Sequence, residues 1–377
     1  MTLQSTSFKK FLSILRNALN ITDELPAEVS AEEWTELYKF SQSHALLGVV
    51  FEGVRKMKDN AAPPFQMLMQ WIATAEKIRG MNQKFNAKCK QLTEFFEKNG
   101  HKTAILKGQA NSMLYPDSFI RQPGDIDIYV DGGKDSVIKL LNSLNLLSKE
   151  DEDLVAYHHV HLEQHDNSDI MIEVHFLPSS GFYNPFSNKR LQNFLLEEVK
   201  YSQLCELGFY VPTMKFALAM QLAHIQGHFL EEGIGLRQII DYYFLLKNSS
   251  QDDRNEISAM LDKFGVNTFT SALMYIFKEM FMLDESLMLC KPNEKKGKKL
   301  LNEILSYGNF GWFGHGNNYK NIHRSVYRKF HSFRFLTFYL HEFHWFLLYS
   351  VVYFIQRIPL RIKYKTWSLE TVYLKSK

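Results

Sequence analysis

The strongest structural signal in this chain is the pair of stretches Leu106-Lys107-Gly108-Gln109 and Gly124-Asp125-Ile126-Asp127-Ile128-Tyr129-Val130. Side chains in a strand alternate between faces, so Asp125 and Asp127 point the same way while the apolar residues between and after them face the core. Neighbouring carboxylates repel one another unless a cation neutralises them, and Mg²⁺ favours oxygen ligands. The pattern indicates a metal site. The alternative is a turn residue at Asp125 and an exposed strand position at Asp127.

A third carboxylate lies in a second run with strand alternation, residues 170–176, where Glu173 and His175 share the less apolar face. The run from Val155 to Gln164 also has an extended pattern. The turn-rich Asp166-Asn167-Ser168-Asp169 between the two predicts a hairpin. The pattern leaves open which residue of the first strand Glu173 opposes, because one step in register exchanges the faces.

A wider set of residues accompanies these strands: Ile105-Leu106-Lys107-Gly108, Leu114-Tyr115-Pro116, Arg121, Glu173-Val174-His175, Gly235-Leu236-Arg237 and Asp241. Through them the chain resembles the nucleotidyltransferase superfamily with the polymerase-beta-like fold, and specifically its branch of uncharacterised nucleotidyltransferases. The likeness covers about residues 30 to 250. It implies a glycine turn after one strand, Asp-x-Asp on the next and a third acid later. Gln109 stands where the superfamily commonly has glycine or serine, and the gap from Gly108 to Asp125 is longer than in its compact members.

The resemblance implies an enzyme that moves a nucleoside monophosphate from a nucleoside triphosphate, ATP among the candidates, to a hydroxyl-bearing acceptor and releases pyrophosphate. Asp125 and Asp127 would hold two Mg²⁺ ions, and Glu173 would complete the metal site and take part in catalysis. The nucleotide-binding candidates are Lys107, Gly108, Gln109, Arg121 and Arg237. For Lys107 and Arg121 the alternative is an ordinary surface cation, and Arg237 could instead pair with Asp241 four residues along a helix.

The expected fold class is α/β (α+β), with a small mixed-sheet core of the polymerase-beta-like nucleotidyltransferase type flanked by helical regions. We expect an N-terminal helical region at 1–100, the catalytic core at 101–210, a helical domain at 211–305 and a loop plus an aromatic, basic helical region at 306–377. A capping box at Ser30 and Glu33 predicts a helix, and Pro63-Pro64 precedes a long helix that stops near Asn99-Gly100. Thr213 is the expected N-cap of a later helix.

The composition of the 377 residues narrows the class of protein: a net charge of +3 does not indicate a wholesale nucleic-acid binder. Three widely spaced cysteines suggest neither a disulfide framework nor a zinc site, which fits a reducing cytoplasm. His224 and His228 lie four apart on a predicted helix and could bind zinc, but only Glu231 or Glu232 offers a third ligand. The histidines at 158, 159, 161 and 165 alternate across a strand, so they cannot all bind one ion.

The C-terminal segment has a different character, with 11 Lys or Arg residues against Glu342 and Glu370 between Tyr319 and Lys377, and many aromatic side chains. Residues 335–355 lack Lys and Arg, but His341, Glu342 and His344 argue against a membrane span. Interfacial membrane attachment and a buried helix followed by a polyanion-binding basic tail remain alternatives. Two further functions stay open: a nucleotide-binding or regulatory protein without turnover, and a membrane-associated scaffold acting through this segment.

Overall fold

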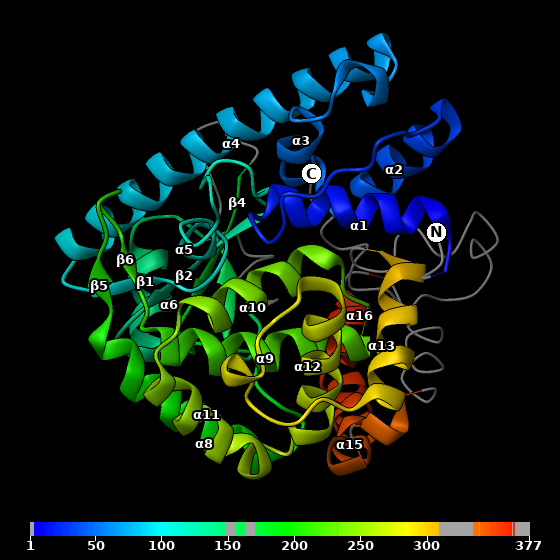
Figure 1. Ribbon diagram of the computed structural model, residues 1–377. Helices are drawn as coiled ribbons and strands as arrows, with labels where there is room; N and C mark the ends of the chain where they lie inside the picture. The colour runs from blue at the N-terminus through cyan, green and yellow to red at the C-terminus, as the bar shows by residue number, and fades with distance from the viewer. Residues whose placement is uncertain are drawn as a thin grey trace.

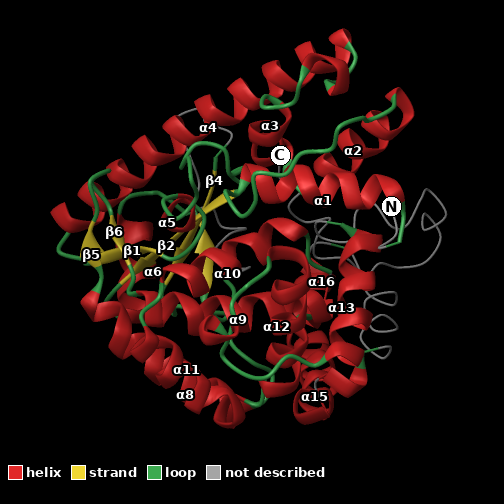
Figure 2. Ribbon diagram, viewed as in Figure 1, coloured by secondary structure: helices red, strands yellow, loops and turns green. Residues whose placement is uncertain are grey.

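A small sheet with helices packed around it lies toward the left of the view in the computed structural model (Figure 1). The structure describes residues 4–147, 155–162, 170–231, 233–308, 335–338, 340–363 and 365. Figure 2 shows the four-stranded sheet surrounded by helices, which is the α/β arrangement with helical flanks that the sequence predicts.

The start of one N-terminal helix and both ends of the long helix fall where the sequence predicts. The capping box at the start of α2 is present: Glu33 N–H donates to Ser30 Oγ at 3.3 Å, and Ser30 N–H donates to Glu33 Oε2 at 2.8 Å. The long helix α4 starts after Pro64 and ends before Asn99 and Gly100, whose φ is +81°. The helices of this region are α1 (Thr6–Ala18), α2 (Ala31–Ser43), α3 (Leu47–Val54), the short 3-10 helix η1 (Asp59–Ala61) and α4 (Phe65–Lys98).

The sheet has the strand order β1-β2-β4-β3. Its strands are β1 (Thr103–Ile105), β2 (Asp125–Val130), β3 (His159–His161) and β4 (Met171–His175), and helices α5 (Gln109–Ser112) and α6 (Gly133–Ser143) follow β1 and β2. β2 pairs antiparallel with β1 and parallel with β4, while β3 and β4 pair antiparallel. The predicted pairing of the Val155 to Gln164 run with the Glu173 strand is therefore confirmed. The expected turn at Asp166 to Asp169 lies outside the described residues.

The two faces of the sheet differ in chemistry. Ile126, Ile128 and Val174 lie in an apolar cluster with Phe85 of α4 and Val137 of α6, so these two helices cover one face. The other face carries the acidic and histidine residues of β2 and β4 and lies toward α9 (Met214–Glu231) and α10 (Leu236–Asn248), on the opposite side from α4 (Figure 1). Burial of alternate residues thus fixes which side chains can form a site.

Helices fill most of the chain after the sheet. Thr213 caps α9 as predicted, because its Oγ1 accepts a hydrogen bond from Phe216 N–H at 3.1 Å. Arg16 of α1 donates to the backbone oxygen of Met280 at 2.8 Å, which joins the N-terminal helices to this part of the core. The remaining elements up to residue 308 are α8 (Pro185–Glu198), η2 (Val199–Tyr201), β5 (Gln203–Leu204), β6 (Tyr210–Val211), α11 (Gln251–Phe264), α12 (Asn267–Phe281), η3 (Glu285–Leu287) and α13 (Glu294–Tyr307).

The C-terminal helices pack against α8 through one face. Glu342 of α15 is 1% exposed and accepts a hydrogen bond from Asn184 N–H at 2.9 Å, next to the start of α8. Tyr183 also contacts Phe346, with ring centroids 5.0 Å apart. Among the described residues no helix is both long enough and apolar enough to cross a membrane. The elements are η6 (Leu336–Phe338), α15 (Leu340–Gln356) and α16 (Ile358–Lys363). From residue 309 on, the loop expected at the start of the 306–377 region lies outside the described residues.

Cys89, Cys205 and Cys290 are free thiols.

Candidate active site

Asp125 and Asp127 project from the same face of β2, and Lys107 lies beside both. Lys107 Nζ is 3.6 Å from Asp125 Oδ2 and 3.1 Å from Asp127 Oδ2. The side chain of Asp125 is 36% exposed, whereas that of Asp127 is 1% exposed. Lys107 stands directly after Leu106, whose N–H donates to the Asp127 carbonyl oxygen at 2.9 Å. The β1–β2 pairing therefore places the ammonium against the two carboxylates.

Glu173 lies on the neighbouring strand, directly across from Asp127. The parallel register pairs Asp127 with Glu173, and Asp125 with Met171. This is the register that the sequence pattern left open. His175 bridges the two acids, because its Nε2 is 3.2 Å from Asp127 Oδ1 and 3.4 Å from Glu173 Oε2. The three predicted acids and two basic side chains thus form one cluster.

The charges of this cluster reinforce one another. Burial alone would lower the pKa of Lys107, but the three carboxylates raise it above its ordinary value. Burial likewise opposes protonation of His175, and contacts with Asp127 and Glu173 raise its pKa to about 9. Burial would raise the pKa of Glu173, but the hydrogen bond from His175 and the nearby histidines lower it to about 2. At neutral pH the negative charge of Glu173 therefore lies beside the positive charges of Lys107 and protonated His175.

Gly108 forms the turn between β1 and α5. Its φ of +61° and ψ of −100° lie in a region that side chains disfavour, which explains glycine at this position. The helix that follows the turn begins at Gln109 and contains 4 residues. The Gln109 side chain is 2% exposed and donates to Asn86 Oδ1 of α4 at 2.5 Å. The Gln109 side chain therefore holds the turn against α4. Only the backbone of Gln109 is then left to contact a nucleotide.

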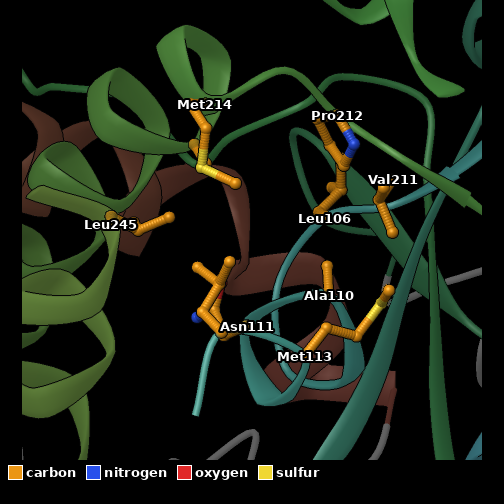
Figure 3. A pocket seen from close by; sticks show the side chains of 10 residues that line it. Leu106, Ala110, Asn111, Met113, Val211, Pro212, Met214 and Leu245 are labelled. Atoms are coloured by element: carbon orange, nitrogen blue, oxygen red, sulfur yellow. The ribbon is translucent and has the colours of Figure 1, made fainter. Parts of the chain in front are cut away.

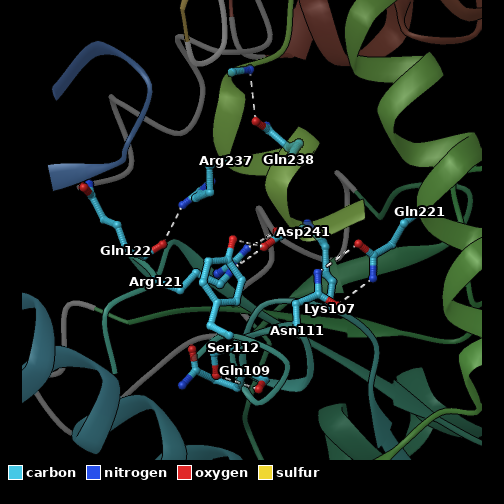
Figure 4. A network of polar contacts seen from close by, with 12 residues as sticks. Lys107, Gln109, Asn111, Ser112, Arg121, Gln122, Gln221, Arg237, Gln238 and Asp241 are labelled. Carbon is cyan, nitrogen blue, oxygen red and sulfur yellow. Dashed lines mark hydrogen bonds and ion pairs between the residues drawn. The ribbon is translucent and has the colours of Figure 1, made fainter. Parts of the chain in front are cut away.

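Arg121 lies in a buried polar network with Asp241 of α10 (Figure 4). Its Nε donates to Asp241 Oδ1 at 2.8 Å, and its Nη2 donates to Asp241 Oδ2 at 2.7 Å. Tyr115 Oη also donates to Asp241 Oδ1, at 2.7 Å. Arg237 donates to the Gln122 carbonyl oxygen at 2.9 Å. Asp241 thus forms its ion pair with Arg121, whereas the sequence suggested Arg237 as the partner.

The network fixes the loop that leads into β2. Burial would raise the pKa of Asp241, but the charge and hydrogen bonds of Arg121 outweigh burial and lower it. Burial, followed by the charge of Arg121, lowers the pKa of Arg237. Arg121 contacts Asp241 of α10, and Arg237 of α10 contacts the backbone of Gln122, so both contacts tie α10 to residues three or four positions before Asp125. They are therefore placed to position Asp125.

Histidines surround Glu173 on the hairpin. His159 faces Glu173, with Nδ1 3.8 Å from Oε2, and the antiparallel register places His161 opposite Glu173. His158 Nε2 lies 2.8 Å from His159 Nδ1. Burial, partly offset by Glu173, lowers the pKa of His159 to about 4, and burial also lowers the pKa of His158. The sequence indicated that these histidines alternate, but it did not show which of them share the Glu173 face.

His224 and His228 lie on α9 with ring centroids 4.3 Å apart. Burial, then the charge of Lys107, lowers the pKa of His224, so α9 faces the acidic cluster. Neither histidine belongs to the groups of three described residues whose ligand atoms lie within 4.8 Å of one another. Among the described residues these two histidines have no such third ligand, and Glu232 lies outside the described residues.

The acidic cluster has donors suited to a divalent cation. Ligand atoms of Asp127, Glu173 and His175 lie within 4.8 Å of one another. Carboxylate oxygens suit Mg²⁺, and Asp125 reaches the cluster through its shared contact with Lys107. The residues present therefore fit the metal that the resemblance implies.

A separate apolar pocket opens beside the turn (Figure 3). Figure 3 shows Leu106 and Ala110 on one side and Met214 and Leu245 on another. None of the three carboxylates lines this pocket, so it is separate from the acidic cluster.

The mixed sheet, the helical flanks and this set of acids define a protein with an α/β nucleotidyltransferase-like core. Residues 30–282 match the family described as uncharacterised nucleotidyltransferase, and the chain belongs to that family. The matched range contains the sheet and α10, and with them every site residue predicted from the sequence. A search among curated proteins returns no match to this chain. Membership supports a general nucleotidyltransferase role.

Proposed function

We propose that this protein is a Mg²⁺-dependent nucleotidyltransferase that moves a nucleoside monophosphate from a nucleoside triphosphate to a hydroxyl-bearing acceptor. The observation that carries the proposal is the pairing of Asp127 with Glu173 across β2 and β4, beside Asp125 and next to the Gly108 turn. Family membership supports the class of reaction. The acceptor and the preferred base are not part of the proposal.

Asp125, Asp127 and Glu173 hold the metal ions in this proposal. When bound, Mg²⁺ stabilises charge on the attacking, bridging and leaving oxygens and lowers the pKa of the acceptor hydroxyl. Glu173 would complete the metal site and could take the proton of the acceptor hydroxyl. Because the pKa of Glu173 is lowered to about 2, it is charged at neutral pH and ready to serve as a ligand.

Lys107 and Gly108 bind the phosphates. The backbone at Gly108 admits a close approach because a Cβ there would meet only the Asp125 carbonyl oxygen, at 3.5 Å. The Lys107 ammonium lies against the two aspartates, and its flexible stem would let it reach the β- and γ-phosphates of a bound nucleotide.

Arg121 and Arg237 act mainly by holding the loop before Asp125. Arg121 is 5% exposed and already bonded through two guanidinium nitrogens, so a direct phosphate contact requires it to leave Asp241. Arg237 is 9% exposed and keeps one hydrogen bond to Gln122. Of the two, we propose Arg237 as the nucleotide contact and Arg121 as the positioning residue.

The test compares Asp127→Asn with wild type in nucleotide transfer with Mg²⁺, each nucleoside triphosphate and a broad panel of hydroxyl acceptors. Asn keeps the shape of the side chain and removes its charge, so transfer and pyrophosphate release should be lost while the fold persists. Asp135→Asn, the same change at an exposed position of α6, is the matched control. Full activity in Asp127→Asn would refute the proposal.

A nucleotide-binding protein without turnover is the second candidate, favoured by the Gln109 side chain, which is committed to α4. Calorimetry separates the two: nucleotide binding in wild type without pyrophosphate across the acceptor panel favours this candidate over the enzyme.

A further inference from the structure

We propose that the hairpin of β3 and β4 carries a second cation site, formed by His159, His161 and Glu173, that binds a transition-metal ion of the Zn²⁺ class. Ligand atoms of these three residues lie within 4.8 Å of one another. This site extends the proposed function by one neighbouring ion, but its existence depends on neither nucleotide nor turnover.

The strand geometry brings the three side chains together. His159 and His161 are two residues apart in β3, so they share a face, and their ring centroids lie 5.2 Å apart. The antiparallel register sets His161 opposite Glu173, while His159 Nδ1 lies 3.8 Å from Glu173 Oε2. A backbone ladder holds all three Cα positions, so the arrangement does not depend on a loop.

The spacing and exposure suit an entering ion. Ligand atoms bound at about 2.1 Å in a tetrahedral site stand about 3.4 Å apart. All three residues are partly exposed, so small side-chain rotations can close the remaining distance, and solvent can deliver the ion. Two nitrogens and one oxygen leave a fourth position open, as in catalytic zinc sites.

The ligand types set this site apart from the magnesium site. Imidazole nitrogens favour Zn²⁺ and related ions, whereas Mg²⁺ favours carboxylates and water. The two aspartates of β2 supply oxygen, and β3 supplies nitrogen, so the two sites share Glu173 and otherwise differ.

His158 restrains the His159 ring before an ion arrives. Its Nε2 lies 2.8 Å from His159 Nδ1, the nitrogen that also faces Glu173. An ion bound through Nδ1 would displace this contact.

The test measures Zn²⁺ binding by the full chain through competition with a chromophoric chelator, without nucleotide. Wild type should bind Zn²⁺ at this site, and His161→Ala should weaken that affinity by more than the roughly 10- to 100-fold that loss of an outer-shell partner causes. His344→Ala, which removes an exposed histidine of α15, is the matched control and should leave the affinity unchanged. Circular dichroism and thermal melting of each variant show that the fold is retained.

Asp125→Asn distinguishes this inference from the proposed function. It removes a predicted magnesium ligand but no ligand of the second site. It should therefore leave the Zn²⁺ affinity within about twofold of wild type, which is a much smaller change in binding free energy than the loss of a ligand causes. Equal Zn²⁺ affinity in wild type and folded His161→Ala, or no Zn²⁺ binding by wild type, would overturn the second site. Either result leaves nucleotide transfer as a separate question.

Discussion

The Lys107→Met substitution removes the ammonium that offsets the negative charge of the acidic cluster. The stability of the folded protein should then depend on an added cation. Lys107 Nζ lies 3.1 Å from Asp127 Oδ2, and the Asp127 side chain is 1% exposed. Removing one partner of a buried ion pair costs about 3 to 5 kcal/mol, because it leaves the other charge without compensation.

The expected loss lies at the lower end of that range. Asp125 is 36% exposed, so solvent screens its 3.6 Å contact with Lys107 and that contact adds little. His175 also remains 3.2 Å from Asp127 Oδ1 and continues to offset its charge. We therefore expect the free energy of unfolding without metal to fall by about 3 kcal/mol.

The assay is urea unfolding with and without Mg²⁺. An ion that binds the folded state at 100 times its dissociation constant adds about 2.7 kcal/mol. Mg²⁺ should stabilise Lys107→Met more than wild type, because in the variant the ion no longer competes with an ammonium. Lys139→Met, the same change at an exposed position of α6, serves as the control. The reasoning is refuted if Lys107→Met is as stable as the control without metal, or if Mg²⁺ stabilises wild type equally.

Two further predictions concern the buried network and the pH dependence. Asp241→Asn should lower the free energy of unfolding by about 3 to 5 kcal/mol, since it leaves the buried Arg121 guanidinium without its carboxylate; urea unfolding measures this, and an unchanged midpoint would contradict the structural role. Because the pKa of His175 is raised from 6.5 to about 9, its stabilising contribution is complete below pH 6.5 and is lost as the pH rises through 9. That contribution is about 3 kcal/mol. Wild type should therefore exceed His175→Gln in free energy of unfolding at pH 6, and the difference should shrink toward pH 10; a difference that does not change with pH would contradict this.

Much of the sheet could be predicted from the sequence because burial imposes a period of two. Alternation in residues 125–130 and 170–176 predicted both strands, and the structure places Ile126 and Val174 in the apolar cluster as expected. Pro64 and Thr213 likewise marked helix starts, since proline and capping side chains act through local backbone chemistry.

The partners within the site could not be predicted in the same way. The sequence suggested that Arg237 pairs with Asp241, because both lie on one helix, yet Arg121 reaches Asp241 from 120 residues away. The pairing of Asp127 with Glu173 depends on a parallel register that joins distant strands. Such contacts are set by packing between elements, which local periodicity does not encode.

The C-terminal segment shows the same limit. The sequence indicated that burying Glu342 within an aromatic run would be energetically costly. Its carboxylate accepts a hydrogen bond from the Asn184 N–H at the start of α8. A buried acid needs a partner, but the sequence does not say that the partner lies 158 residues earlier. Its neighbours Leu348, Val351 and Ile355 are exposed on α15, so the helix packs through one face.

The most direct test of the central claim is a crystal structure of the protein with Mg²⁺ and a non-hydrolysable nucleoside triphosphate. We predict ions within about 2.1 Å of carboxylate oxygens from Asp125 and Asp127, with Glu173 in the same site and the triphosphate along the Gly108 turn. A nucleotide bound elsewhere, with Lys107 still against Asp125 and Asp127 and no ion between them, would contradict the account.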